Sequence, residues 1–133
     1  MSKQSFTVSL VVPVYNEEES IDTFIETIDK ELAPLRDQLE IVFVNDGSRD
    51  RTREVVEKAI EKDSRVTLIN LARNFGKEAA MTAGLAHARG DAVVPMDVDL
   101  QDPPALVLEF VRMWKEEGYD TVYGVDRKST RLN

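Results

Sequence analysis

The chain has 133 residues, and its 17 Lys and Arg against 25 Asp and Glu give a formal net charge of −8. This length predicts one domain, since domains run to roughly 100–200 residues, and the apolar content suffices for a core. The absence of cysteine excludes a disulfide framework, thiolate zinc and a cysteine nucleophile, and the acidic balance argues against nucleic-acid binding. Because we find neither a long apolar run nor a signal-peptide pattern, we expect a cytoplasmic protein.

Short β-branched runs alternate along the chain with segments of helical periodicity. In chain order, the predicted elements are strand 7–14, helix 18–32, strand 39–44, helix 50–62, strand 66–71, helix 77–88, strand 92–96, helix 104–117 and strand 121–125. Strands joined through helices by short links require right-handed parallel crossovers. The predicted fold class is therefore α/β, an open and mostly parallel sheet with helices on both faces.

Two local patterns predict how particular helices begin and pack. Asn16 followed by Glu19 has the spacing of a capping box, although Asn replaces the usual Ser or Thr. In the last predicted helix, Phe110, Met113 and Trp114 recur at helical spacing, and we expect this stripe to face the core.

Polar residues follow each of the first four predicted strands. In doubly wound sheets, ligands bind beyond the carboxyl ends of the strands, where the strand order reverses. If the order is 3-2-1-4, the loops after the first, second and fourth strands meet over one crevice. We expect the functional site there.

The loop after the fourth strand contains Asp97-Val98-Asp99. In an extended segment, residues two apart point the same way, so both carboxylates and Gln101 are able to converge on Mg²⁺ or Mn²⁺. A cation held by two or three protein oxygens keeps positions open for phosphate oxygens. The alternative is a polar turn ahead of the next helix.

The loops after the second and third strands also admit two interpretations. Asp46 belongs either to an ordinary turn, with Ser48 or Asp50 capping the next helix, or to a site that accepts N–H groups of a nucleobase. Arg73 and Lys77 are either a solvated pair or phosphate ligands at a helix start.

Several nucleotide-binding and catalytic motifs are missing from the sequence. No Gly-x-Gly-x-x-Gly follows the first strand, and no Walker Gly-Lys-Ser/Thr or Gly-x-Ser-x-Gly is present. This argues against dinucleotide-dependent dehydrogenases, P-loop NTPases and serine hydrolases.

Four motifs together resemble the inverting family 2 glycosyltransferases of GT-A fold, most closely the polyprenyl-phosphate sugar transferases such as bactoprenol glucosyltransferases and dolichol-phosphate mannose synthases. The motifs are VPVYNEE at 12–18, VNDGSRDRT at 44–52, RNFGKEAA at 73–80 and MDVDLQDPP at 96–104. The resemblance covers residues 6 to about 125. It implies transfer of a sugar from a UDP- or GDP-sugar to a polyprenyl phosphate, with Mg²⁺ or Mn²⁺ as cofactor.

The resemblance also implies roles for residues at matching positions. Pro13, Tyr15 and Glu17 would line the nucleoside pocket, with Asp46 on the base. Asp97 would lie near the ribose and diphosphate, and Asp99 and Gln101 would hold the metal, with Asp97 and Asp99 as the catalytic pair. For Arg73 and Lys77 we predict phosphate contacts.

Members of this family continue past the resembling segment with an acceptor-binding half, and the bactoprenol enzymes add transmembrane helices. We therefore interpret residues 1–125 as a truncated donor-binding domain, and expect membrane association, at the cytoplasmic face, only of the full-length protein. The alternative is a non-catalytic nucleotide-sugar-binding or regulatory module. Codons that would encode residues 126–133 resemble a sequencing-library adapter read in frame, so we expect a non-native or disordered tail. The alternative is a basic segment that leads into a membrane-proximal half.

Overall fold

The computed structural model describes residues 6–101 and 103–117, so the predicted fifth strand at 121–125 and the tail at 126–133 lie outside the described residues. Strands and helices alternate as predicted, with one additional 3₁₀ helix. The elements are β1 (Val8–Val14), α1 (Ile21–Glu31), the 3₁₀ helix η2 (Ala33–Gln38), β2 (Leu39–Asn45), α2 (Thr52–Lys62), β3 (Val66–Asn70), α3 (Lys77–His87), β4 (Ala92–Pro95) and α4 (Ala105–Glu117).

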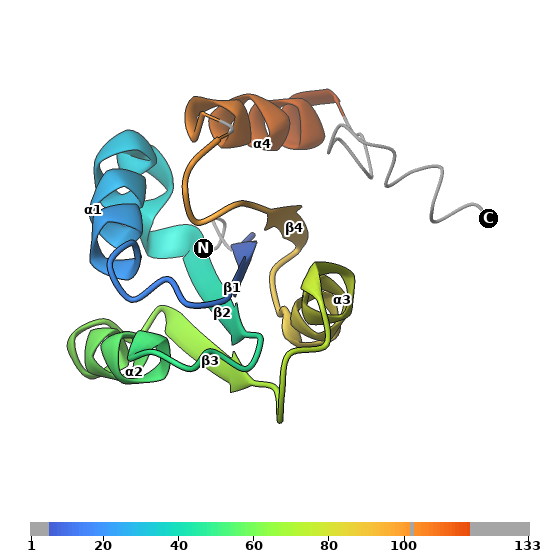
Figure 1. Ribbon diagram of the computed structural model, residues 1–133. Helices are drawn as coiled ribbons and strands as arrows, with labels where there is room; N and C mark the ends of the chain where they lie inside the picture. The colour runs from blue at the N-terminus through green and yellow to red at the C-terminus, as the bar shows by residue number, and fades with distance from the viewer. Residues whose placement is uncertain (1–5, 102, 118–133) are drawn as a thin grey trace.

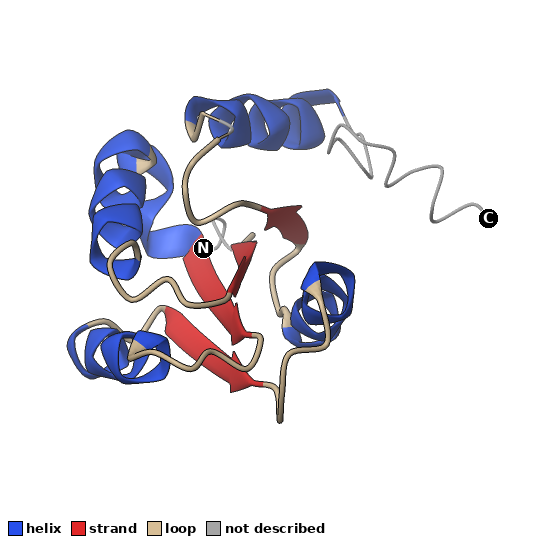
Figure 2. Ribbon diagram, in the orientation of Figure 1, coloured by secondary structure: helices blue, strands red, loops and turns tan. Residues whose placement is uncertain are grey.

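The described strands form one parallel sheet in the order β3-β2-β1-β4, which confirms the predicted fold class (Figure 2). β1 lies between its two partners, with Val8 opposite Leu39 on β2 and opposite Ala92 on β4. The strand order reverses between β1 and β4. Because all strands run the same way, the loops after β1, β2 and β4 emerge side by side at one edge of the sheet.

Alternating side chains on the strands supply two separate cores. Leu10 and Val12 of β1 and Phe43 of β2 belong to the core under α1, α2 and α4, whereas Val11 and Val44 belong to the core under α3. Figure 1 shows α3 on the opposite side of the sheet from α1 and α2. Burial of both faces is the physical reason that these strands are almost continuously apolar.

Helix α1 packs through the apolar stripe that the sequence predicts, because Ile21, Phe24 and Ile28 are all fully buried. The Phe24 ring meets the Phe43 ring edge-on, with centroids 5.8 Å apart. The helix begins three residues later than predicted, after Ser20 as N-cap. Glu17 accepts a backbone hydrogen bond from Ser20 at 2.9 Å, so the residues before the helix form a turn instead.

Helix α4 packs on a different stripe from the one predicted. Val107 and Val111 are its buried residues, whereas Phe110, Met113 and Trp114 are only half-buried. The Trp114 ring packs against Phe6, with centroids 5.4 Å apart. Two overlapping apolar stripes run along this helix, and helical periodicity alone does not choose between them.

Helix α3 lies very close to the sheet. A Cβ atom on Gly84 would stand 2.3 Å from Val11 Cγ1, so only glycine permits this approach. The helix therefore lies flat across β1 and β2, with its first residue, Lys77, at the edge where the strands end.

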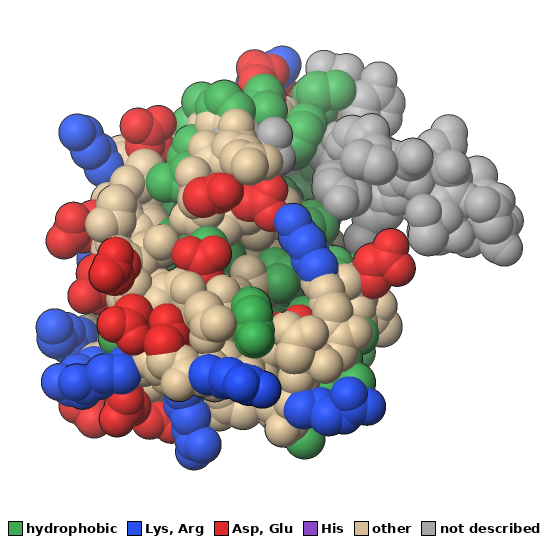
Figure 3. All heavy atoms as spheres, viewed as in Figure 1, with side chains coloured by type: hydrophobic (Ala, Val, Ile, Leu, Met, Phe, Trp, Pro, Cys, Tyr) green, Lys and Arg blue, Asp and Glu red, His purple; other side chains and the backbone are tan. Residues whose placement is uncertain are grey.

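Acidic side chains dominate the centre of the face drawn in Figure 3, whereas most Lys and Arg side chains in this view lie toward its lower edge. Within residues 6–101 and 103–117, no helix is both long and apolar enough to span a bilayer.

Candidate functional site

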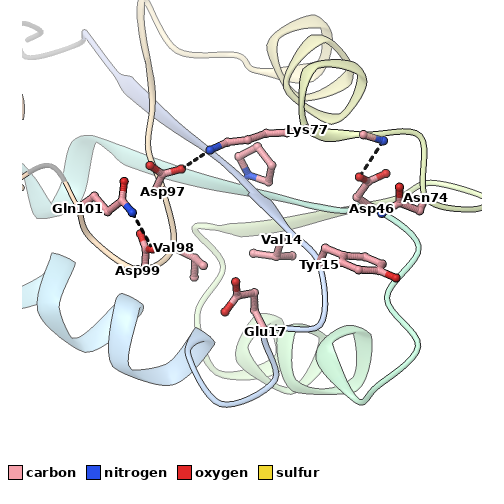
Figure 4. A pocket seen from close by; sticks show the side chains of 12 residues that line it. Val14, Tyr15, Glu17, Asp46, Asn74, Lys77, Asp97, Val98, Asp99 and Gln101 are labelled. Carbon is pink, nitrogen blue, oxygen red and sulfur yellow. Dashed lines mark hydrogen bonds and ion pairs between the residues drawn. The ribbon is translucent and has the colours of Figure 1, made fainter.

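Four loops enclose a pocket of about 370 Å³ at the carboxyl edge of the sheet (Figure 4). Three of these loops follow β1, β2 and β4, as the predicted strand order requires, and the fourth connects β3 to α3. The pocket is lined by Pro13, Val14, Tyr15, Glu17, Asp46, Asn74, Gly76, Lys77, Asp97, Val98, Asp99 and Gln101. The structure thus gathers every predicted site residue except Arg73.

Asn16 joins the β1 loop to the β2 loop. Its side-chain oxygen accepts hydrogen bonds from the backbone N–H groups of Arg49, at 2.8 Å, and Asp50, at 3.3 Å, while its own N–H donates to Ser48 Oγ. Asn16 adopts a left-handed conformation with φ 54°, which Asn tolerates better than most residues. The capping-box prediction for Asn16 is therefore wrong: its side chain bonds to a distant loop rather than to α1.

Thr52 also connects the β1 loop to the β2 loop, from a buried position. Its hydroxyl, which is fully buried, accepts the N–H of Glu17 at 2.8 Å and donates to Asp50. Asp50 also accepts the N–H groups of Thr52 and Glu18, so it bonds to the first residue of α2 although Arg51 is the N-cap of that helix. Burial tends to raise the pKa of Asp50, but these hydrogen bonds outweigh it and hold the pKa below its ordinary value.

One side of the pocket combines an exposed aromatic ring with a buried carboxylate. Tyr15 is 42% exposed, whereas Asp46 is only 4% exposed and accepts two backbone N–H groups from the β3–α3 loop. Pro13 and Glu17 line the pocket beside them. A ring available for stacking next to a hydrogen-bond acceptor matches the flat face and N–H edge of a nucleobase.

The opposite side carries the remaining charged residues. Lys77 Nζ lies 2.6 Å from Asp97 Oδ1, and the Gln101 amide donates to Asp99 Oδ2 at 3.3 Å. Figure 4 shows Lys77 extending across the pocket to Asp97, with Asp99 and Gln101 beyond that pair and Asp46 and Tyr15 on the other side.

Asp97 and Asp99 reach the pocket through a turn rather than an extended segment. β4 ends at Pro95, and the Leu100 N–H bonds to the carbonyl of Asp97 at 3.0 Å. Leu100 itself has φ 58°. The prediction that an extended segment aligns the two carboxylates is therefore wrong. Both carboxylates nevertheless line the same pocket.

The donor atoms on this side of the pocket fit a hard divalent cation. Asp97, Asp99 and Gln101 offer carboxylate and amide oxygens, which Mg²⁺ and Mn²⁺ prefer. In the part of the chain that the structure describes, no three acidic or histidine side chains gather at one point. A cation held here would therefore need further ligands, such as phosphate oxygens.

Arg73 lies outside the pocket although Lys77 lines it. The Arg73 guanidinium stacks over the Phe75 ring, 4.3 Å from its centroid. Its contact with phosphate stays a prediction. Asn74 and Gly76 also line the pocket, although neither was predicted as a site residue. A glycine directly before a helix that starts with lysine is the sequence signal that could have identified this loop.

A parallel sheet in this order, with a polar pocket over its carboxyl edge, defines an open, doubly wound α/β domain. The family model for glycosyl transferase family 2 matches residues 9–130. The chain belongs to glycosyl transferase family 2.

Curated relatives with substantial identity include two bacterial proteins and one phage protein. The chain is 44% identical over 120 residues to the uncharacterized glycosyltransferase sll0501 of Synechocystis, covering 90% of this chain and 37% of that protein. It is 46% identical to the uncharacterized glycosyltransferase YkcC of Bacillus subtilis, with the same coverage. It is 48% identical to the bactoprenol glucosyl transferase of Shigella phage SfV, over 86% of this chain and 37% of that protein. The chain thus spans little more than a third of each relative.

Solved structures agree with this assignment. The mannosyltransferase PcManGT of Pyrobaculum calidifontis, in complex with GDP-Man and Mn²⁺, superposes with a TM-score of 0.63 at 30% identity, covering 77% of this chain and 35% of that one. S. aureus TarS 1-349 in complex with UDP-GlcNAc superposes with a TM-score of 0.62 at 29% identity, over 79% of this chain and 32% of that one.

Proposed function

We propose that this chain is the donor-binding domain of an inverting glycosyltransferase that transfers a sugar from a nucleoside diphosphate to a polyprenyl phosphate. The observation that carries the proposal is the pocket itself, which places a stacking ring, a buried carboxylate, a lysine and two further carboxylates around one volume. The bactoprenol glucosyl transferases among the relatives support the lipid acceptor, and the GDP-Man and UDP-GlcNAc complexes support the donor.

The side of the pocket with Tyr15 and Asp46 is assigned to the nucleoside. Tyr15 stacks on the base, Asp46 accepts a base N–H, and Pro13 and Glu17 close the pocket around the ribose. We assign Lys77 to the diphosphate because its ammonium lies between the nucleoside side and the carboxylates of the β4 loop. Its charge favours phosphate oxygens over a neutral ligand.

Asp99 and Gln101 are proposed to hold Mg²⁺ or Mn²⁺, with Asp97 beside the ribose and diphosphate. The Mn²⁺ bound with GDP-Man in PcManGT supports this assignment. A cation there would neutralise the charge that develops on the departing diphosphate.

In the proposed reaction, an oxygen of the acceptor phosphate attacks the anomeric carbon from the side opposite the nucleoside diphosphate. The new carbon–oxygen bond forms as the bond to the diphosphate breaks, and the diphosphate leaves with the electron pair. Since the acceptor oxygen is already anionic, no side chain has to remove a proton. The chain's own residues act by orienting the donor and stabilising charge.

Calorimetric titration of the chain with UDP and GDP, with and without Mn²⁺, tests the donor and metal assignments. We expect metal-dependent binding that Asp99→Asn reduces on the order of tenfold. Asp22→Asn, which removes an exposed carboxylate of α1, is the matched control and leaves the affinity unchanged. Equal metal dependence in Asp99→Asn and the wild-type chain would contradict the metal assignment.

Incubating the chain with a radiolabelled nucleotide sugar and polyprenyl phosphate tests the transfer step. Lipid-linked sugar shows that the chain completes the reaction. Nucleotide binding without lipid-linked sugar restricts its function to holding the donor.

A further inference from the structure

The Asp46 carboxylate is buried beneath the β3–α3 loop and bonds to its backbone. Oδ1 accepts the N–H of Phe75 at 2.8 Å, and Oδ2 accepts the N–H of Gly76 at 3.0 Å. Both oxygens thus bind consecutive amides of one loop, and the side chain is only 4% exposed. Hydrogen bonds from neutral donors to a buried carboxylate are among the stronger ones in proteins, because its charge strengthens them.

Gly47 brings this loop within reach of Asp46. Its φ is +74°, and a Cβ atom there would lie 2.4 Å from both Arg73 C and Asn74 N. The loop backbone therefore rests directly on Gly47, and no other residue allows that approach. Gly47 thus packs against residues 73 and 74 of the loop, and Asp46 bonds to residues 75 and 76.

The side chains of the loop bury little apolar surface. Arg73, Asn74 and Phe75 are exposed, and the Phe75 ring is 48% exposed with the Arg73 guanidinium stacked on it. The loop also follows β3, which is the outer strand on its side of the sheet. Because little apolar burial holds the loop, the two hydrogen bonds that its N–H groups donate to Asp46 contribute a large part of its order.

Lys77 comes directly after the second amide that Asp46 accepts. Gly76 has φ +104°, so the chain turns there and α3 begins with Lys77. From this point the Lys77 ammonium crosses to Asp97, which follows a strand on the far side of β2 and β1. The position of Gly76 thus sets where Lys77 enters the pocket.

We propose that Asp46 is a positioning residue for Lys77, acting through the backbone of residues 75 and 76, in addition to any contact with the base. This inference rests on the proposed function in assigning Lys77 to the donor diphosphate. A carboxylate that only contacts the base changes the affinities for mono- and diphosphates by the same factor. A carboxylate that positions Lys77 affects diphosphates more.

The first test measures hydrogen exchange of the Phe75 and Gly76 amides in the ligand-free chain by NMR. In Asp46→Asn one amide loses its acceptor, and we expect faster exchange at one or both positions. Asp91→Asn is the matched control, because Asp91 also accepts a backbone N–H, that of Thr7 at 2.9 Å, away from the pocket. Unchanged exchange at both amides in Asp46→Asn overturns the inference, whatever the chain binds.

The second test compares UMP with UDP, and GMP with GDP, in the wild-type, Asp46→Asn, Lys77→Met and doubly substituted chains. We expect Asp46→Asn to weaken diphosphate binding on the order of tenfold more than monophosphate binding. When Lys77→Met is already present, Asp46→Asn should weaken mono- and diphosphate binding equally, because the lysine that Asp46 positions is absent. An equal loss for mono- and diphosphates, or the same extra factor without Lys77, overturns the inference.

Gly47→Ala supplies a second variant that keeps the Asp46 side chain. Its added Cβ displaces the loop backbone, so we expect the same diphosphate-selective loss. Equal losses for mono- and diphosphates in this variant also count against the inference. A wild-type chain that binds none of the four nucleotides overturns the proposed function instead, and the exchange rates then decide the inference alone.

Discussion

Lys77 Nζ lies 2.6 Å from Asp97 Oδ1, which connects the start of α3 to the loop after β4 across the two strands between β3 and β4. The Lys77 side chain is 66% exposed and that of Asp97 is 29% exposed. An ion pair this accessible to water contributes little to folding. The ion pair instead places the Lys77 ammonium inside the pocket.

Lys77→Met is accordingly expected to separate stability from binding. We expect the free energy of unfolding to change by less than about 0.5 kcal/mol, because the pair is exposed. The affinity for UDP or GDP should fall on the order of tenfold, because a charge-assisted contact to phosphate is lost. Urea unfolding and calorimetric titration measure the two effects. Lys58→Met, on the exposed side of α2, serves as the control and should change neither.

Asp63→Asn tests a charge cluster away from the pocket. Arg65 Nη2 lies 2.6 Å from Asp63 Oδ2 and 2.7 Å from Asp29 Oδ1, and the Arg65 and Asp63 side chains are only 15% and 21% exposed. We expect the substitution to lower the free energy of unfolding by about 2 kcal/mol at neutral pH. Glu57→Gln, which breaks the exposed pair with Arg53, should cost less than about 0.5 kcal/mol.

The same variant carries a prediction about pH. The hydrogen bond from Arg65 lowers the pKa of Asp63 below its ordinary value of 3.8. A carboxyl group whose pKa is lower in the folded state stabilises the fold above the unfolded pKa, and this stabilisation is lost as the pH falls through the folded pKa. Wild type and Asp63→Asn should therefore differ less in their free energies of unfolding below about pH 3 than at neutral pH. Urea unfolding at the two pH values measures this difference.

Thr52→Val removes one hydroxyl from a fully buried position at almost constant volume. The N–H of Glu17 loses its acceptor and Asp50 loses a donor, so we expect a loss of about 2 kcal/mol in the free energy of unfolding. Nucleotide affinity should also fall, because Glu17 lines the pocket. Thr82→Val, at an exposed position of α3, is the control. An unchanged affinity in Thr52→Val would show that the connection between the loops does not shape the pocket.

Gly84→Ala tests how closely α3 must approach the sheet. Alanine favours a helix by about 1 kcal/mol, but its Cβ would stand 2.3 Å from Val11 Cγ1 and 2.9 Å from Val44 Cγ2. Overpacking of a core costs about 1–3 kcal/mol, so we expect a net loss of stability in thermal unfolding. Thr82→Ala, which places alanine on the exposed side of the same helix, should not destabilise the protein.

Local periodicity and chain direction are enough to predict the alternation of strands and helices and the edge of the sheet at which the site lies. Ile21, Phe24 and Ile28 repeat at helical spacing and are all buried, because α1 has a single apolar stripe. In a parallel sheet every strand ends at the same edge, so Asp46 and Asp97 had to lie along that edge once the strands were known. These conclusions need only local periodicity and chain direction.

Which side chains meet at that edge depends on the strand order and on how the loops pack, neither of which local sequence reveals. Sequence spacing treats Arg73 and Lys77 as equivalent cations, yet one stacks on Phe75 and the other reaches Asp97. Likewise, nothing local shows that both oxygens of Asp46 bind the loop after β3. The contacts of Asp46 and Lys77 join residues 20 to 30 positions apart in the chain, and their geometry depends on how each loop packs against its neighbours rather than on its own sequence.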